Sequence, residues 1–155
     1  MPQLHYEDFI EGSVQDFGPR SITRDEIISY AREFDSQPMH LDEEAAKNSL
    51  LGGLSASGWH TCCFMFRMMY DYFVKDSASL GSPGIEETRW LRPVRPGSAL
   101  TLRLEVLDKR VSKSRPEMGL VRMRNQLLDE SGAPVIDQVS TLLIGLREPQ
   151  GEPVR

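Results

Sequence analysis

The hydrophobic positions of this chain follow a helical period in its first half and a strand period in its second half. In the first half, apolar side chains recur at helical spacing over residues 24–34: Ile27, Ile28, Ala31 and Phe34. Thr23 precedes this segment and Glu26 follows it by three positions, which is the Thr-x-x-Glu pattern of a helix capping box. We therefore predict a helix that begins at Arg24 and ends near Phe34.

A longer apolar segment, from Ser57 to about Lys75, predicts the central helix of the fold. One stripe of this segment is apolar throughout: Trp59, Cys62, Cys63, Phe66, Met69, Tyr70 and Phe73. Further apolar residues cover most of the remaining circumference: Phe64, Met65, Met68 and Tyr72. A helix that is apolar on nearly every side needs other elements around it. A short helix is also predicted over 42–48, where Asp42 is a good N-cap.

From Ile85 onward the hydrophobic period becomes two, which predicts β-strands. The expected strands cover 85–91, 100–106, 120–128 and 134–146, with turns at 93–97 and 129–132. The expected N-terminal elements are an edge strand or arm over 5–17 and a short strand over 20–23, and the Ser/Gly/Pro-rich segment 77–84 is an expected loop. Because helices come first and strands follow, the predicted class is α+β, with a long antiparallel sheet wrapped around one buried helix.

A carboxylate and an imidazole stand five positions apart, at Asp35 and His40, with Pro38 between them. Proline cannot continue the preceding helix, and it disfavours a helical backbone at Gln37. We therefore expect a loop from Asp35 to His40 in which the two side chains converge. Histidine titrates near neutral pH, and a carboxylate can share a water molecule with it, so the pair is a candidate for general acid–base catalysis.

The start of the long helix adds a candidate for stabilising negative charge. Backbone N–H groups in the first turn of a helix lack internal partners, and the helix dipole favours an anion there. The N–H of Gly58 is therefore the candidate oxyanion donor. Ser57, directly before it, fits either a helix N-cap or a substrate contact.

Composition restricts the class of protein. The chain has 155 residues, 39% hydrophobic and 26% charged, which suits one domain over 1–155, with a core over about 6–146 and a tail over 147–155. A net charge of −5 disfavours nucleic-acid binding, and no apolar run is long enough to span a bilayer. The first residues lack a secretion-signal pattern, and the two cysteines, Cys62 and Cys63, are adjacent, which disfavours a bridge between them. We therefore expect a reduced, cytoplasmic protein.

Three segments, in order along the chain, resemble one enzyme family. The first contains Tyr30 and the sequence DSQPMHLD over 35–42, which resembles the hydratase-2 motif of the MaoC-like dehydratases, Asp-x-Asn-Pro-aliphatic-His. The second, over 52–58, resembles the family's turn into its central helix, and the third, over 91–98, resembles its turn between the next two strands. Two positions depart from the family pattern: Gln37 stands where Asn is common, and Ser57 where His is frequent.

The resemblance implies a hot-dog fold, in which an antiparallel sheet wraps one long helix, and a homodimer with acyl-thioester sites near the subunit interface. The usual family reaction is reversible hydration of a trans-2-enoyl-CoA to a (3R)-hydroxyacyl-CoA. We expect no metal, because the chain has no metal-ligand spacing, and no separate cofactor, because coenzyme A is part of the substrate. The expected catalytic residues are Asp35, His40 and Gly58. The expected substrate contacts are Gln37, Ser57, Arg92 and Arg95.

Two other functions fit the same residues. A hot-dog thioesterase would use a carboxylate to direct water at the carbonyl carbon, and a non-catalytic module would bind the acyl thioester without reacting with it. Taken singly, Asp35 also fits a turn-forming residue, His40 a capping or packed histidine, and His60 a structural residue. A basic segment between strands fits either a contact with coenzyme A phosphates or a solvated hairpin: Lys109, Arg110, Lys113 and Arg115.

Overall fold

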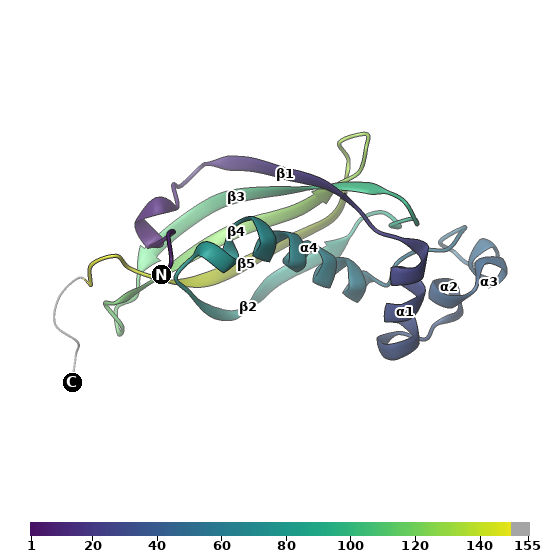
Figure 1. Cartoon of the computed structure of the whole chain (residues 1–155), viewed down its shortest axis with the longest axis horizontal. Helices are drawn as coiled ribbons and strands as arrows, with labels where there is room; N and C mark the ends of the chain where they lie inside the picture. The colour runs from purple at the N-terminus through teal and green to yellow at the C-terminus, as the bar shows by residue number, and fades with distance from the viewer. Residues whose placement is uncertain (150–155) are drawn as a thin grey trace.

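The structure, a computed structural model, describes residues 1–149. Helix α4 (Gly58–Tyr72) lies against a five-stranded antiparallel sheet that wraps around it (Figure 1). The strand order across the sheet is β1-β3-β4-β5-β2, so β1 and β2 form its two edges. The strands are β1 (Val14–Ser21), β2 (Ser79–Trp90), β3 (Ala99–Val111), β4 (Met118–Leu128) and β5 (Pro134–Gly145).

The helices lie along the middle of the sheet and at both of its ends. Three of them, α1, α2 and α3, cluster beyond the end of the sheet where α4 begins (Figure 1). The helices are η1 (Tyr6–Asp8), α1 (Arg24–Phe34), α2 (Pro38–Leu41), α3 (Glu43–Lys47), α4 (Gly58–Tyr72) and η2 (Val74–Asp76). The predicted α+β class is confirmed, as are the helix over 24–34 and the strands that follow the central helix. No helix within residues 1–149 is long and apolar enough to cross a membrane.

The start of α1 follows directly from its sequence. Thr23 accepts a hydrogen bond from the backbone N–H of Glu26, and the Glu26 carboxylate accepts one from the backbone N–H of Thr23. Asp42 caps α3 in the same manner, because its side chain accepts from the N–H of Ala45. Both predicted caps are confirmed, and they set where each helix begins.

The segment from Asp35 to His40 differs from the predicted loop, because Pro38 opens the one-turn helix α2. Proline lacks only an N–H that the first residue of a helix does not need, and its fixed φ suits that position. Pro38 therefore ends one helical pattern and also begins the next helix. The connection that remains irregular runs from Asp35 to Gln37.

The core lies between α4 and the sheet, and the predicted stripe matches the buried face of α4 only in part, at Met69 and, just past the helix, Phe73. The buried residues of α4 are His60, Thr61, Phe64, Met65, Met68 and Met69. Four members of the predicted stripe are exposed instead: Trp59 at 63%, Phe66 at 50%, Tyr70 at 43%, and Cys63. Because the helix is apolar on nearly every side, its period alone cannot identify the side that meets the sheet.

The two edge strands also differ from expectation. Most of the predicted loop over 77–84 belongs to β2, which pairs with β5 through several register shifts, and Gly81 and Gly84 there have positive φ. At the other edge, β1 is one strand with a bulge between Phe17 and Arg20 rather than two separate segments. Edge strands are exposed and can therefore contain Gly, Ser and Pro, so the composition of β1 and β2 resembles that of a loop. Most of the predicted tail over 147–155 lies outside the described residues.

We expect Leu102→Ala to lower the free energy of unfolding by about 2–5 kcal/mol, because Leu102 is fully buried against the core and the change leaves a cavity. Urea denaturation followed by circular dichroism measures the loss. Thr101→Ala, at the adjacent position on the opposite face of β3, is the control, and we expect a change below about 1 kcal/mol. Equal losses in the two variants would contradict the inward orientation assigned to Leu102.

Candidate active site

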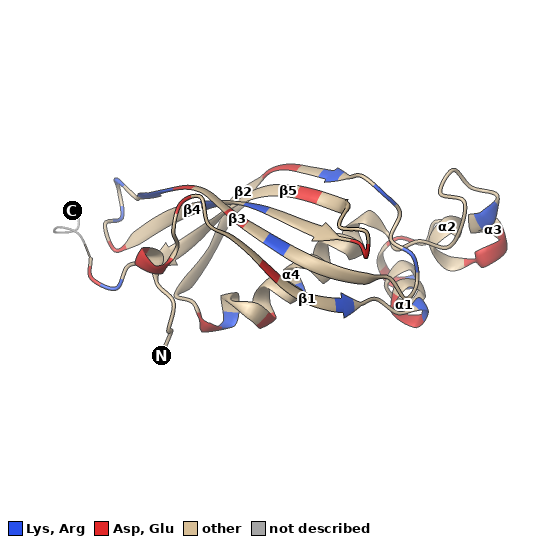
Figure 2. Ribbon diagram, turned by 90° about the horizontal axis from the view of Figure 1, so that it is seen from above, with Lys and Arg blue, Asp and Glu red and all other residues tan. Residues whose placement is uncertain are grey.

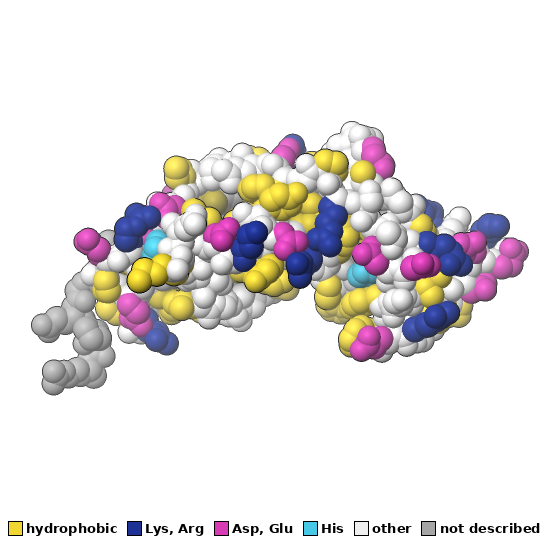
Figure 3. Space-filling model, in the orientation of Figure 1, with side chains coloured by type: hydrophobic (Ala, Val, Ile, Leu, Met, Phe, Trp, Pro, Cys, Tyr) yellow, Lys and Arg dark blue, Asp and Glu magenta, His cyan; other side chains and the backbone are white. Residues whose placement is uncertain are grey.

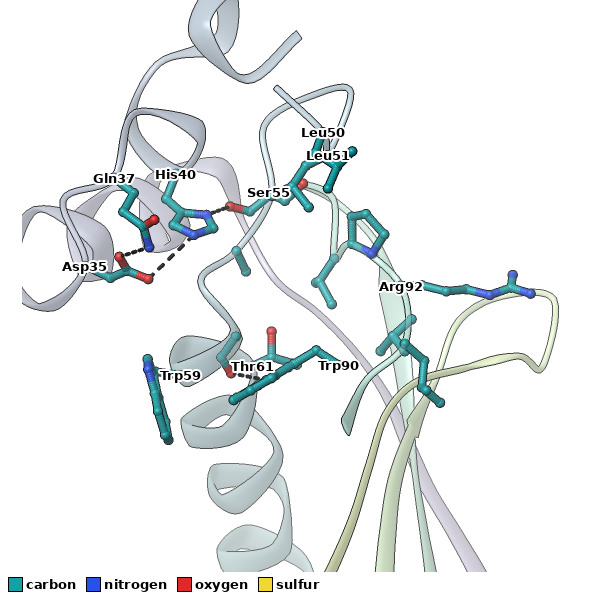
Figure 4. Close-up of a pocket in the computed structure, with 16 residues that line it drawn as sticks. Asp35, Gln37, His40, Leu50, Leu51, Ser55, Trp59, Thr61, Trp90 and Arg92 are labelled. Atoms are coloured by element: carbon teal, nitrogen blue, oxygen red, sulfur yellow. Dashed lines mark hydrogen bonds and ion pairs between the residues drawn. The ribbon is translucent and has the colours of Figure 1, made fainter. Parts of the chain in front are cut away.

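A cavity of about 530 Å³ lies where the α1–α2 connection, the first turn of α4 and the end of β2 meet (Figure 4). Asp35, Gln37 and His40 line one side of it. Gly58 and Trp90 line another side, and Figure 4 shows the Trp90 ring beside the start of α4. The remaining lining is mainly apolar: Leu50, Leu51, Ala56, Trp59, Leu91, Pro93, Val94 and Val135. Asp35, Gln37 and His40 therefore lie together on one side of a largely apolar cavity, and a few convergent polar groups of this kind are usual in small-molecule sites.

Asp35, the C-cap residue of α1, accepts hydrogen bonds on both carboxylate oxygens. The Gln37 side-chain nitrogen donates to Oδ1 at 2.7 Å, and the Ser57 hydroxyl donates to Oδ2 at 2.6 Å. The Ser57 hydrogen bond is the largest cause that lowers the pKa of Asp35, while partial burial acts in the opposite direction and Gln37 lowers it further. These bonds favour the ionised carboxylate and hold it in one orientation.

His40 lies on α2 with one ring nitrogen bound and the other directed at Asp35. Its Nδ1 is 2.8 Å from the carbonyl oxygen of Ser55, and because a carbonyl only accepts, Nδ1 carries the proton in the neutral ring. Its Nε2 then has a free lone pair and stands 3.5 Å from Oδ2 of Asp35. The Asp35 and His40 side chains therefore converge, as the sequence predicts (Figure 4).

Gly58 is the first residue of α4, so its N–H has no partner within the helix. Its carbonyl oxygen accepts a hydrogen bond from the indole nitrogen of Trp90 at 2.8 Å. A Cβ at this position would lie 2.6 Å from two atoms of the Trp90 ring, which is closer than packing allows. Glycine is therefore needed here for the approach of Trp90, in addition to any role of its N–H.

Ser57 occupies the N-cap position of α4, but its side chain does not cap the helix. The side chain is fully buried and donates to Asp35 instead. The sequence suggests an N-cap or a substrate contact for Ser57, and the structure places it behind Asp35 and outside the cavity lining.

The two predicted arginine contacts have different surroundings. Arg92 lines the cavity, its side chain is 58% exposed, and it lies 3.7 Å from Asp129. The Arg95 guanidinium lies outside the lining and donates to the carbonyl oxygens of Leu51 and Gly53 and to the Ser55 hydroxyl. Arg95 therefore holds the segment that carries the Ser55 carbonyl, and its role as a substrate contact stays a prediction.

His60 faces α1 rather than the cavity. It is 9% exposed and stacks on Tyr30, with ring centroids 4.5 Å apart and planes 6° apart. Burial is the largest cause that lowers the pKa of His60, so the neutral ring is favoured. These contacts agree with the structural role that the sequence suggests for this histidine.

The basic segment around the β3–β4 hairpin lies at the opposite end of the sheet from α1, α2 and α3 (Figures 1 and 2). Lys109 stands over the Tyr6 ring, 4.4 Å from its centroid, and donates to the Tyr6 carbonyl. Arg115 pairs with Glu117 at 2.8 Å. Within one chain, these cations therefore do not reach the cavity.

Sequence reasoning missed two residues that shape the site, Ser55 and Trp90. Ser55 acts through its backbone carbonyl, which leaves no signal in the side-chain sequence. Trp90 stands directly before the Leu-Arg-Pro turn that the sequence singled out, so an aromatic residue at the end of a strand was an available signal.

Comparison with known proteins places the chain in a family. The model for the MaoC like domain matches residues 8–126. A MaoC-like dehydratase of known structure from Rhodospirillum rubrum is 34% identical, with a TM-score of 0.83, and the match covers 94% of this chain and 99% of that one. The R-hydratase PhaJ1 from Pseudomonas aeruginosa shares the fold at 20% identity, with a TM-score of 0.73 and coverage of 98% and 96%. The uncharacterised protein YdeM of Bacillus subtilis is 27% identical over 91% of this chain and 99% of its own length.

These likenesses confirm the predicted hot-dog fold and support a function in the hydratase and dehydratase class. The family model covers most of the chain, and the Rhodospirillum rubrum relative matches nearly all of it. The chain therefore belongs to the MaoC-like domain family, the family of the MaoC-like dehydratases.

Proposed function

We propose that the chain hydrates a trans-2-enoyl thioester reversibly, giving a (3R)-hydroxyacyl thioester, with acyl-CoA as the substrate. The observation that carries the proposal is the arrangement of Asp35 and His40 on one side of the cavity. Oδ2 of Asp35 and Nε2 of His40 are 3.5 Å apart, and the hydrogen bond from Nδ1 to Ser55 leaves Nε2 free to take a proton.

The two facing atoms suit the binding of the reacting water. An ionised carboxylate and a neutral Nε2 both accept hydrogen bonds, so a donor between them is favourable. A water molecule donates one hydrogen to each, and its oxygen lone pairs then point toward the cavity. Ser57 and Gln37 support this arrangement because they favour the ionised form of Asp35.

The reaction follows from these positions. The water oxygen attacks C3 of the enoyl thioester while His40 Nε2 takes a proton from the water. Negative charge moves onto the thioester oxygen, where the Gly58 N–H is the proposed donor. The protonated Nε2 then delivers its proton to C2, so one hydroxyl and one hydrogen are added and His40 returns to its neutral form. Asp35 orients the water throughout, and the reaction needs no metal or separate cofactor.

We also propose that the active form is a cytoplasmic homodimer. Edge strand β2 and the outer side of α4 expose large apolar residues, of which Trp59, Phe66, Leu80 and Ile85 are each at least half exposed. Figure 3 shows hydrophobic side chains across the middle of this face. A second copy that covers this surface would remove it from water.

We expect His40→Ala and Asp35→Asn each to lower kcat/KM by at least about 100-fold, since both remove a group from the water-binding pair. Loss of the conjugated-thioester absorbance of crotonyl-CoA measures turnover, and circular dichroism checks the fold. His5→Ala, outside the cavity, is the matched histidine control and should keep the wild-type rate. Full activity in both site variants would contradict the mechanism, and release of free thiol in place of hydration would favour a thioesterase.

We expect Ser57→Ala to raise the pKa of Asp35, because the largest cause that lowers it is the hydrogen bond from the Ser57 hydroxyl. The ionised carboxylate loses a donor in the variant, so it takes up a proton at a higher pH than in the wild type. Carbon-detected NMR titration of the carboxyl groups measures the change. Asp16, whose pKa is lowered by Arg103, is an internal control, and its pKa should be the same in the variant and the wild type. An unchanged pKa of Asp35 in the Ser57→Ala variant would contradict the role given to Ser57.

We expect light scattering to give a mass of twice the 17.6 kDa chain, and Phe66→Glu to reduce it to that of one chain. A buried carboxylate at the interface would lack a counter-charge, which disfavours association. Ile10→Glu, at an exposed apolar residue of the N-terminal segment, is the control and should remain dimeric. A wild-type mass of one chain at micromolar concentration would contradict the dimer.

A further inference from the structure

The side of the sheet that faces α4 carries a row of polar side chains in the middle of an apolar core. The strand register pairs Leu104 with Asn125, Asn125 with Gln138, and Gln138 with Thr88. Residues paired in this way project from the same face. Leu104 belongs to the core cluster around α4, so its partners also face α4. We call Asn125, Gln138 and Thr88 the polar row. The next row of paired residues, on the side toward the cavity, is apolar: Leu102, Leu127 and Ile136.

The polar row has hydrogen-bonding capacity that the protein does not use. Asn125 is 0% exposed, and its Nδ2 donates to the Ser140 hydroxyl at 2.8 Å, while its Oδ1 is buried with no partner within residues 1–149. Gln138 donates through Nε2 to the Thr88 hydroxyl at 3.0 Å. Each hydroxyl that accepts one of these bonds retains a proton that it can donate. Burial of an unpaired acceptor is unfavourable, so the row suits an additional polar group.

The row begins next to the wall of the candidate active site. Trp90 lines the cavity, and Thr88 lies two positions before it on β2, on the same face and about 6.6 Å away along the strand. Gln138 pairs with Thr88, just as Ile136 pairs with Trp90. A group that extends past Trp90 along β2 therefore meets Thr88 and Gln138 first.

The row is uncharged, and this restricts the group that fits it. The ionic side chains of β4 and β5 project from the opposite face, where Arg124 lies 3.4 Å from Asp137. A carboxylate on the row would be buried without a counter-charge, and an alkyl chain would leave unused the hydrogen-bonding capacity that remains on the amides and hydroxyls of the row. A hydroxyl or a carbonyl group can pair with them.

We infer that the acyl chain of the substrate extends past Trp90 and carries an uncharged polar group, a hydroxyl or a carbonyl, that binds Gln138 and Thr88. This assignment rests on the proposed hydration at Asp35 and His40, and it specifies the acyl group on which that site acts. An unbranched alkyl chain that is long enough to reach the row is then a poor substrate.

The test is a series of trans-2-enoyl-CoA substrates with a hydroxyl on the fourth, fifth or sixth carbon, each compared with the analogue in which a methyl group replaces the hydroxyl. We expect the wild-type protein to prefer at least one hydroxylated substrate over its analogue by at least about 10-fold in kcat/KM, because a site that binds a hydroxyl rejects a chain without one. Absorbance of the conjugated thioester reports both members of each pair.

Two variants test whether the row causes this preference. Gln138→Leu removes the amide, and Thr88→Val removes one hydroxyl at an edge position with little change in shape. Each should reduce the preference toward unity. Gln126→Leu makes the same change as Gln138→Leu at a neighbouring position on the opposite face of the sheet, and it should leave the preference unaltered. Thermal melts check folding, and Thr88→Val decides the outcome if Gln138→Leu does not fold.

The outcomes separate this inference from the proposed function. Hydration of the alkyl analogues at equal or higher kcat/KM across the whole series overturns the inference and leaves the hydratase proposal intact. A preference that survives in both row variants also overturns it, because the polar group then binds elsewhere. Absence of hydration with every substrate overturns the proposed function and this inference together. A preference for a hydroxylated substrate in the wild type that is lost in Gln138→Leu and Thr88→Val supports the inference.

Discussion

The hydrogen bond from Ser57 to Asp35 is the contact on which the candidate site depends, because it joins two segments 22 residues apart. It connects the end of α1 to the start of α4, so the carboxylate and the helix N-terminus keep a fixed separation. With Gln37 on the other oxygen, the carboxylate has one orientation and one preferred ionisation state. A charged group that is held on both oxygens can orient a small ligand without rearranging first, which is the usual benefit of preorganisation.

The histidine depends on a second chain of contacts. Arg95 binds the backbone of the segment over 51–55, and the Ser55 carbonyl in that segment binds His40. A cation outside the cavity thus holds the segment whose carbonyl sets the tautomer of a ring inside it. The site is therefore sensitive to residues that never meet the substrate, because each reactive group is oriented by a neighbour.

Much of the architecture could be predicted where local chemistry decides it. The capping box at Thr23 set the start of α1, alternating side chains gave the strands after residue 85, and the short motif from Asp35 to His40 identified the two side chains that converge. Prediction failed for features that depend on contacts between distant parts of the chain. The buried face of α4, the partner of Ser57 and the carbonyl that binds His40 all depend on segments distant in sequence.

The packing of Trp90 on Gly58 has a consequence for how this site can change. A ring occupies the space that a side chain on residue 58 would fill, and the indole also binds the carbonyl of that residue. The two positions therefore exclude volume from each other, and a larger residue at one is compatible only with a smaller residue at the other. Substitutions at the two positions should be strongly non-additive. Widening the cavity by natural or directed evolution then requires paired exchanges, so single-step variation in this corner of the cavity is restricted.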